Sequence, residues 1–128
     1  MSPDDATEAD VGVVTIFYNR SCSKSREALG TLQERSVEFV LVEYLDNPPS
    51  RQTLELLISK LVDPVVELVR TSDARFLEIG LDPGAYQTSE AVLELLLVHP
   101  ELLQRPILMN HDRAVIARSG AKVDQFLE

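Results

Sequence analysis

The chain has 128 residues, the length of one domain, and its 45% hydrophobic and 26% charged residues exclude collagen-like, coiled-coil and low-complexity proteins. No apolar stretch approaches the roughly 18 to 20 residues of a membrane-spanning helix, and no secretory signal is visible, so we expect a cytoplasmic protein without a membrane partner. Twelve Lys and Arg stand against 21 Asp and Glu, a net charge of −9. This charge argues against nucleic acid as a partner, because phosphate backbones are bound by basic surfaces.

Residues 1–10 are predicted to form a flexible acidic extension, because acidic residues stand there among small and polar ones. A single domain is expected over 11–128. It begins with a β-branched and aromatic run at 13–18, which is typical of a buried strand. A helix is predicted over 23–35 and a second strand over 37–44. This order predicts a βαβ unit with parallel strands.

The middle of the chain, about residues 48–104, is predicted to be a helical insertion. Ser50 is a suitable N-cap, Asp63 before Pro64 has the pattern of an N-cap followed by proline at the first helical position, and Gly80 is a helix-ending residue. Four helices are expected, over about residues 50–61, 63–70, 73–79 and 88–99.

The last third of the chain has the pattern of a hairpin followed by a helix. Two short apolar runs at 107–109 and 114–117 flank a polar turn at 110–113, and the final helix is expected from Gly120. The order β-α-β, insertion, β-β-α predicts an α/β fold with a thioredoxin-like core. Element order alone predicts no function.

Cys22 is the only cysteine, so an intrachain disulfide is excluded, and with two histidines in the chain we expect no metal site. It falls between the first strand and the first helix. Free N–H groups and the helix dipole favour the thiolate there, as do Lys24, Arg26 and the Ser25 hydroxyl. An inert buried cysteine, with the basic residues on a solvated helix face, is the alternative.

The same loop can hold an oxyanion beside the thiolate, because helix N–H groups and guanidinium groups converge on it. Asn19-x-x-Cys22-x-x-Ser25-Arg26 resembles the nucleophile loop of the glutaredoxin-coupled arsenate reductase family, together with its uncharacterised close relatives. Further segments in that family's order are Tyr44-Leu45, Pro48-Pro49, Leu68-Val69-Arg70, His99-Pro100 and Leu103-x-Arg105-Pro106-Ile107. The resemblance covers about residues 12–128.

The resemblance implies roles for particular residues. Cys22 matches the nucleophile that forms a thiol–arsenate adduct, and Pro106 matches a cis-proline beside the active site. Ser25 and Arg26 match groups that support the thiolate. The residues that match the oxyanion-binding arginines are Arg70, Arg105 and Arg118. Because no second cysteine is present, the adduct is expected to be resolved by external glutathione with a glutaredoxin. We expect a monomer without a bound cofactor.

Two alternatives remain open. The 99–107 region also resembles Spx-type transcription regulators, which share this fold and bind RNA polymerase. Those regulators commonly sense redox state through a Cys-x-x-Cys pair, and this chain has Ser25 at the second position. They also generally lack arginines matching Arg70 and Arg118, so both differences favour the enzyme. The other alternative is a relative that binds an oxyanion or glutathione without turnover.

Overall fold

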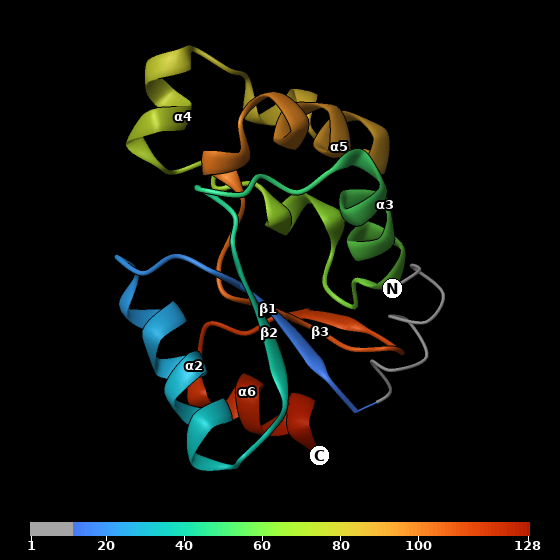
Figure 1. Cartoon of the computed structure of the whole chain (residues 1–128). Helices are drawn as coiled ribbons and strands as arrows, with labels where there is room; N and C mark the ends of the chain where they lie inside the picture. The colour runs from blue at the N-terminus through green and yellow to red at the C-terminus, as the bar shows by residue number, and fades with distance from the viewer. Residues whose placement is uncertain (1–11) are drawn as a thin grey trace.

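The computed structural model describes residues 12–128, and the predicted acidic extension at 1–10 lies outside the described residues. Within the described residues the sheet has four strands, in the order β2-β1-β3-β4. Their bounds are β1 (Val14–Tyr18), β2 (Phe39–Glu43), β3 (Ile107–Met109) and β4 (Ala114–Ile116). β1 pairs parallel with β2 and antiparallel with β3, and β3 pairs antiparallel with β4. The thioredoxin-like order predicted from the sequence is confirmed (Figure 1).

β1 is a central strand that is covered on both faces. Ile16 pairs with Leu41 of β2 on one side and with Leu108 of β3 on the other, and it is fully buried. This position explains why the strand reads as a continuous apolar run. β2 lies at the edge of the sheet, where Val40 and Leu41 are exposed.

The helices α2 (Ser23–Glu34) and α6 (Gly120–Leu127) cover one face of the sheet, as Figure 1 shows. Their apolar side chains pack on alternate residues of β1 and form what we call the α2–α6 cluster. Its members include Val14, Ile16, Tyr18, Ala28, Leu32, Leu108, Val123 and Phe126. This cluster fixes the start of α2 relative to the end of β1.

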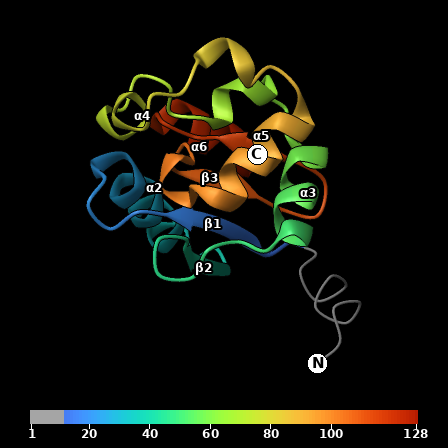
Figure 2. The same ribbon diagram turned by 90° about the horizontal axis from the view of Figure 1, so that it is seen from above.

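The other face is covered by the chain between β2 and β3 (Figures 1 and 2). That segment contains α3 (Arg51–Lys60), η1 (Val65–Leu68), α4 (Ala74–Ile79), η2 (Pro83–Ala85), α5 (Ser89–Val98) and η3 (Pro100–Leu102). It packs on Phe17 from β1 and forms the insertion cluster, whose members include Tyr44, Leu54, Leu57, Leu68, Phe76, Leu96 and Leu103. None of the helices within residues 12–128 is long and apolar enough to cross a membrane.

Most predicted helix boundaries hold, and one is wrong. Ser50 caps α3 by accepting the Thr53 N–H at 3.1 Å, and Gly80 ends α4 with φ +79°. Asp63, however, caps nothing. The helix there is a 3-10 turn that starts after Pro64 and ends at Leu68, before the predicted Arg70. The Asp63 carboxylate instead accepts the Ile116 N–H at 2.8 Å. This N–H, at the end of β4, takes the acceptor that a helix cap would need.

A short antiparallel contact joins the insertion to the segment that enters β3. Val69 and Leu103 form an isolated β-bridge. The Arg70 N–H donates to the Leu102 oxygen at 2.9 Å, and the Gln104 N–H donates to the Leu68 oxygen at 2.7 Å. This contact places Arg70 beside the residues that precede β3, although more than thirty residues separate them in the sequence.

Candidate active site

Cys22 lies between β1 and α2, at the N-cap of the helix. Its backbone is extended, with φ −98° and ψ 121°. Its carbonyl oxygen accepts the Arg26 N–H at 3.1 Å, and its own N–H donates to the Asn19 oxygen at 2.9 Å. The first N–H groups of a helix have no partner within the helix and carry its positive partial charge. The thiol is therefore next to donors that stabilise a negative charge.

The Cys22 thiol is nearly enclosed, with 9% of the residue exposed. Burial raises the pKa of this thiol, but the Ser25 N–H, the Arg105 guanidinium, the Ser25 hydroxyl and the Lys24 N–H outweigh burial and lower the pKa from 9.0 to about 7. About half of the thiol is then ionised at neutral pH, which is typical of reactive cysteines and not of inert core ones.

Ser25 is fully buried one turn into α2. Its hydroxyl oxygen accepts the Asn19 N–H at 3.3 Å, and its N–H and hydroxyl both lower the pKa of the Cys22 thiol. Ser25 therefore connects the loop before Cys22 with the thiol itself. This position agrees with the thiolate-supporting role that the resemblance implies.

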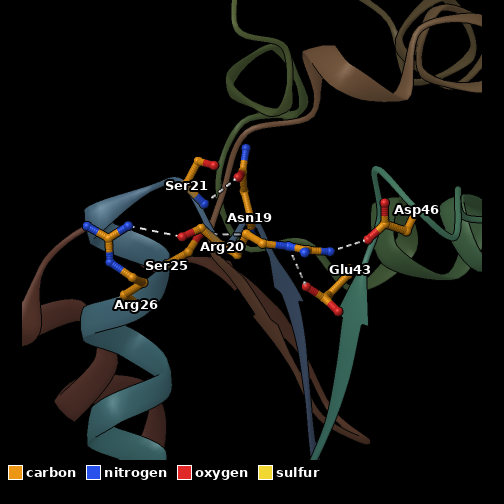
Figure 3. Close-up of polar contacts among 7 residues, drawn as sticks. All are labelled: Asn19, Arg20, Ser21, Ser25, Arg26, Glu43 and Asp46. Carbon is orange, nitrogen blue, oxygen red and sulfur yellow. Dashed lines mark hydrogen bonds and ion pairs between the residues drawn. The ribbon is translucent and has the colours of Figure 1, made fainter.

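Lys24 and Arg26 have other partners than the predicted thiolate. The Lys24 ammonium pairs with Glu27 at 3.6 Å, and its backbone N–H lowers the pKa of the thiol. The Arg26 guanidinium donates to the Arg20 main-chain oxygen at 3.0 Å (Figure 3). Both side chains are exposed, and their support of the thiolate stays a prediction.

The loop that carries Cys22 is fastened to the end of β2. The Asn19 amide oxygen accepts the Ser21 N–H at 2.9 Å, which tightens the turn. The Arg20 guanidinium reaches across to Glu43, at 3.2 Å, and to Asp46, as Figure 3 shows. The Arg20 charge is thereby paired with carboxylates and is not directed at the thiol.

Arg105 supplies the cation at Cys22. It precedes β3, and its peptide bond with Pro106 is cis, as the resemblance implies. The Arg105 guanidinium lies close enough to the Cys22 sulfur to lower the pKa of the thiol. Its Nε atom is buried and has no hydrogen-bond partner among residues 12–128. A buried N–H group without a partner costs free energy, so this position fits an acceptor from a bound anion.

Arg70 and Arg118 come together next to this position, at a hollow of about 620 Å³ whose lining includes both arginines and Gln104. Arg70 pairs with Asp73 at 2.7 Å. Arg118 donates to Gln104 Oε1 at 3.2 Å and to the Arg105 main-chain oxygen. Cys22 does not line the hollow. The structure thus brings one predicted arginine to the thiol and two to the neighbouring space, where their forked donors suit tetrahedral oxyanions.

Two residues near the thiol were not assigned a role from the sequence. Tyr44 is fully buried and lies close enough to Cys22 and Arg105 for their charges to act on its hydroxyl. Asn19 appeared only as a letter of the nucleophile motif. The sequence pattern that could have indicated a role for Tyr44 is its position: it is a polar aromatic residue directly after a strand, at the same edge of the sheet as Cys22. No group of three or more metal-ligating side chains occurs within the described range.

Comparison with known proteins decides the family, because residues 17–126 match the model of the ArsC family. The chain belongs to the ArsC family. An arsenate reductase of Neisseria meningitidis serogroup A is 35% identical over 115 residues, which cover 89% of this chain and 97% of that relative. The uncharacterised protein YfgD of Escherichia coli K12 is 34% identical over 111 residues, covering 86% and 92%.

Solved structures agree with the sequence comparison. A structure described as an arsenate reductase from Vibrio cholerae superimposes with a TM-score of 0.77 at 29% identity, covering 90% of this chain and 98% of that one. The ArsC resemblance and the thioredoxin-like fold predicted from the sequence are therefore confirmed. Relatives of this chain include both arsenate reductases and uncharacterised proteins.

Proposed function

We propose that this chain reduces arsenate to arsenite through a covalent adduct on Cys22, with glutathione and a glutaredoxin as external reductants. The observation that carries the proposal is the pairing of Cys22, whose pKa is lowered to about 7, with the Arg105 guanidinium, whose buried Nε has no partner among the described residues. Relatives named arsenate reductase, such as that of Neisseria meningitidis at 35% identity, support arsenate as the oxyanion. The proposal includes a monomer acting in the cytoplasm without a bound cofactor.

The reaction begins with attack of the Cys22 thiolate on the arsenic atom of the arsenate anion. An arsenic–sulfur bond forms, one arsenic–oxygen bond breaks, and the released hydroxyl takes up a proton and leaves as water. Two external thiols then supply two electrons to the arsenic and leave as a disulfide, while the arsenic–sulfur bond breaks, arsenite leaves and Cys22 returns as the thiol. In total, one arsenate and two thiols give one arsenite, one disulfide and one water. The thiols are external because the chain has one cysteine, which cannot form an intramolecular disulfide.

The attack joins two anions, and fixed cations offset their repulsion. Arg105 is the cation at the sulfur, and we assign it to the oxyanion during attack. Arg70 and Arg118, at the adjoining hollow, are assigned to the departing arsenite-level intermediate and to arsenate on entry. Ser25 stabilises the thiolate through its N–H and hydroxyl.

The test is an arsenate reduction assay with glutathione and glutaredoxin, comparing wild type with Cys22→Ser. Wild type is expected to turn over, and the variant is expected to be inactive but folded. Incubation with arsenate and glutathione is expected to add mass to intact wild type, and glutaredoxin is expected to remove the addition. A control with glutathione and an oxidant separates ordinary glutathionylation from an arsenate-dependent adduct.

Two results would contradict the proposal. An adduct that forms with oxidant but never with arsenate leaves only a general thiol-redox role. Recovery of the protein in complex with RNA polymerase, together with no arsenate-dependent adduct, supports a regulator of transcription instead of an enzyme.

A further inference from the structure

Gln104 lies directly before Arg105, and its amide group has no role in the reaction above. The side chain is half-buried and lines the hollow that Arg70 and Arg118 share. Its main-chain N–H donates to the Leu68 oxygen at 2.7 Å, which fixes Gln104 beside the segment that carries Arg70. Gln104 thus lies among the three arginines that the proposed function assigns to the oxyanion.

The amide oxygen of Gln104 accepts two hydrogen bonds. The Arg105 main-chain N–H donates to it at 3.2 Å, and Nη1 of Arg118 donates to it at 3.2 Å as well. Because both partners are donors, the atom that they contact is the oxygen and not the NH2 group of the amide. One side-chain atom therefore connects the main chain at Arg105 with the guanidinium group of Arg118.

The Arg118 guanidinium is held through one of its two terminal nitrogens. Nη1 donates to Gln104 Oε1 and to the Arg105 main-chain oxygen, so both of its N–H bonds are engaged. The other donors of a guanidinium group, on Nε and Nη2, lie along one edge and match two oxygens of a tetrahedral anion. The contact with Gln104 therefore does not occupy the edge that suits an oxyanion.

Arg118 is an exposed side chain that borders two hollows. One is the hollow of about 620 Å³ that Arg70 and Gln104 also line. The other, of about 310 Å³, lies between α2 and the start of α6 and has Glu27 in its lining. The positive charge of Arg70 repels Arg118, whereas the carboxylate of Glu27 attracts it. A guanidinium group released from Gln104 can therefore turn toward Glu27 and away from Arg70.

We propose that Gln104 is a positioning residue for Arg118, whose amide oxygen keeps the guanidinium group on the side of Arg70 with one edge available to the oxyanion. Glutamine suits this role because its oxygen accepts from a cation without adding a negative charge that would repel the anion. As a role in anion binding, this proposal rests on the proposed function. The contact with Arg118 itself exists without any substrate.

The first test is calorimetric titration of wild type and Gln104→Met with sulfate. Methionine is close to glutamine in length but has only a weak acceptor. The Kd for sulfate is expected to rise about three- to tenfold, the size of one neutral hydrogen bond. Gln87→Met is the matched control, because Gln87 lines the same hollow but donates to the Pro83 oxygen at 3.3 Å. The control is expected to leave the Kd nearly unchanged.

A double-mutant cycle shows whether Gln104 acts through Arg118. In an Arg118→Ala background, Gln104→Met is expected to weaken sulfate binding no further, because the group that it positions is gone. An unchanged Kd in Gln104→Met overturns the proposal. An equal loss in both backgrounds also overturns it, since Gln104 would then act through the Arg105 main chain or contact the anion itself. Absence of sulfate binding in wild type overturns the role in anion binding.

Heteronuclear NMR of the arginine side chains tests the contact with Arg118 without any anion. Rotation about the Cζ–Nη1 bond is expected to be slow in wild type, because acceptors hold both N–H bonds, and faster in Gln104→Met. Gln104→Glu retains an acceptor oxygen, so it is expected to restore slow rotation although its charge weakens sulfate binding. Equal rotation rates in wild type and Gln104→Met overturn the proposal. If wild type reduces no arsenate while the cycle and the NMR results are as expected, the proposed function fails and the role of Gln104 stands.

Discussion

The Arg118 guanidinium donates a hydrogen bond to the main-chain oxygen of Arg105. The Arg105 side chain itself lowers the pKa of the Cys22 thiol, while Arg118 lines the adjoining hollow with Arg70. Arg105 and Arg118 are thus connected through one carbonyl group, but Arg105 lies at the thiol and Arg118 lies at the hollow. This arrangement predicts that the three arginines differ in what they do to the thiol.

Replacing Arg105 with Ala is expected to raise the Cys22 pKa, because a cation that stabilises the thiolate is lost. Arg70→Ala and Arg118→Ala are expected to leave that pKa nearly unchanged, since both arginines line the adjoining hollow, which Cys22 does not line. Alkylation rates against pH measure all three. Equal shifts in the three variants would contradict the separation of roles.

The same three variants are expected to differ less in anion binding. Each substitution removes a charged donor, so binding of sulfate or phosphate is expected to weaken by about 1.5 to 3 kcal/mol, measured by calorimetric titration. The free energy of unfolding is expected to change by less than this. If all three variants bind sulfate as well as wild type, the assignment of these arginines to an oxyanion is wrong.

Lys24→Gln and Arg26→Gln are expected to change the Cys22 pKa by less than about 0.3 unit, because exposed charges without direct contact are screened. The Lys24 backbone N–H, which does act on the thiol, is retained in the variant. Alkylation of the two variants beside Arg105→Ala is the measurement. A shift as large as that of Arg105→Ala would restore the sequence-based view of these residues.

The lowered pKa of Cys22 also makes stability depend on pH. The folded pKa, about 7, is below the ordinary value of 9.0, so the thiolate favours the folded state. This contribution is fully present above pH 9 and is lost as the pH falls through 7. Compared with Cys22→Ser, wild type is expected to gain roughly 2 kcal/mol of unfolding free energy between pH 6 and 9.5. Urea unfolding at both pH values measures the difference, and parallel profiles of the two proteins would contradict it.

Asp63→Ala is expected to destabilise the fold by about 1 to 3 kcal/mol, because the Ile116 N–H at the end of β4 loses its acceptor. The carboxylate that accepts this N–H is mostly buried. Asp82→Ala, which removes an exposed cap from η2, is the control and is expected to cost less. Urea unfolding of both variants measures the two losses, and equal losses would mean that the bond from Ile116 to Asp63 stabilises the fold no more than an exposed cap does.

The sequence predicted the place of Cys22 in the fold correctly because the signals around it are local. A buried strand pattern followed by a helical pattern placed Cys22 at a helix start, and the structure has it at the N-cap of α2. The residues next to Cys22 in the sequence do not identify the cation that lies at the thiol. It depends on the contact between Val69 and Leu103 and on the path of the chain into β3, so nearby Lys24 and Arg26 were chosen over distant Arg105.

Asp63 illustrates the same limit for the fold. An aspartate before proline has the pattern of a helix cap, and only the position of β4 reveals a competing donor, the Ile116 N–H. Tyr44 was visible in the sequence as part of a family segment. Its burial beside Arg105 follows from packing between the sheet and the insertion, which no short pattern encodes.

The division of the interior into two apolar clusters has a consequence for protein engineering. Cys22 is attached to α2, which belongs to the α2–α6 cluster, whereas Tyr44 and Leu103 belong to the insertion cluster on the other face of the sheet. A graft of residues 19–26 onto another strand–helix loop would carry the thiol and the helix N–H groups, but neither Arg105 nor Tyr44. The reactivity of this cysteine is thus a property of the whole domain and is not portable with its loop.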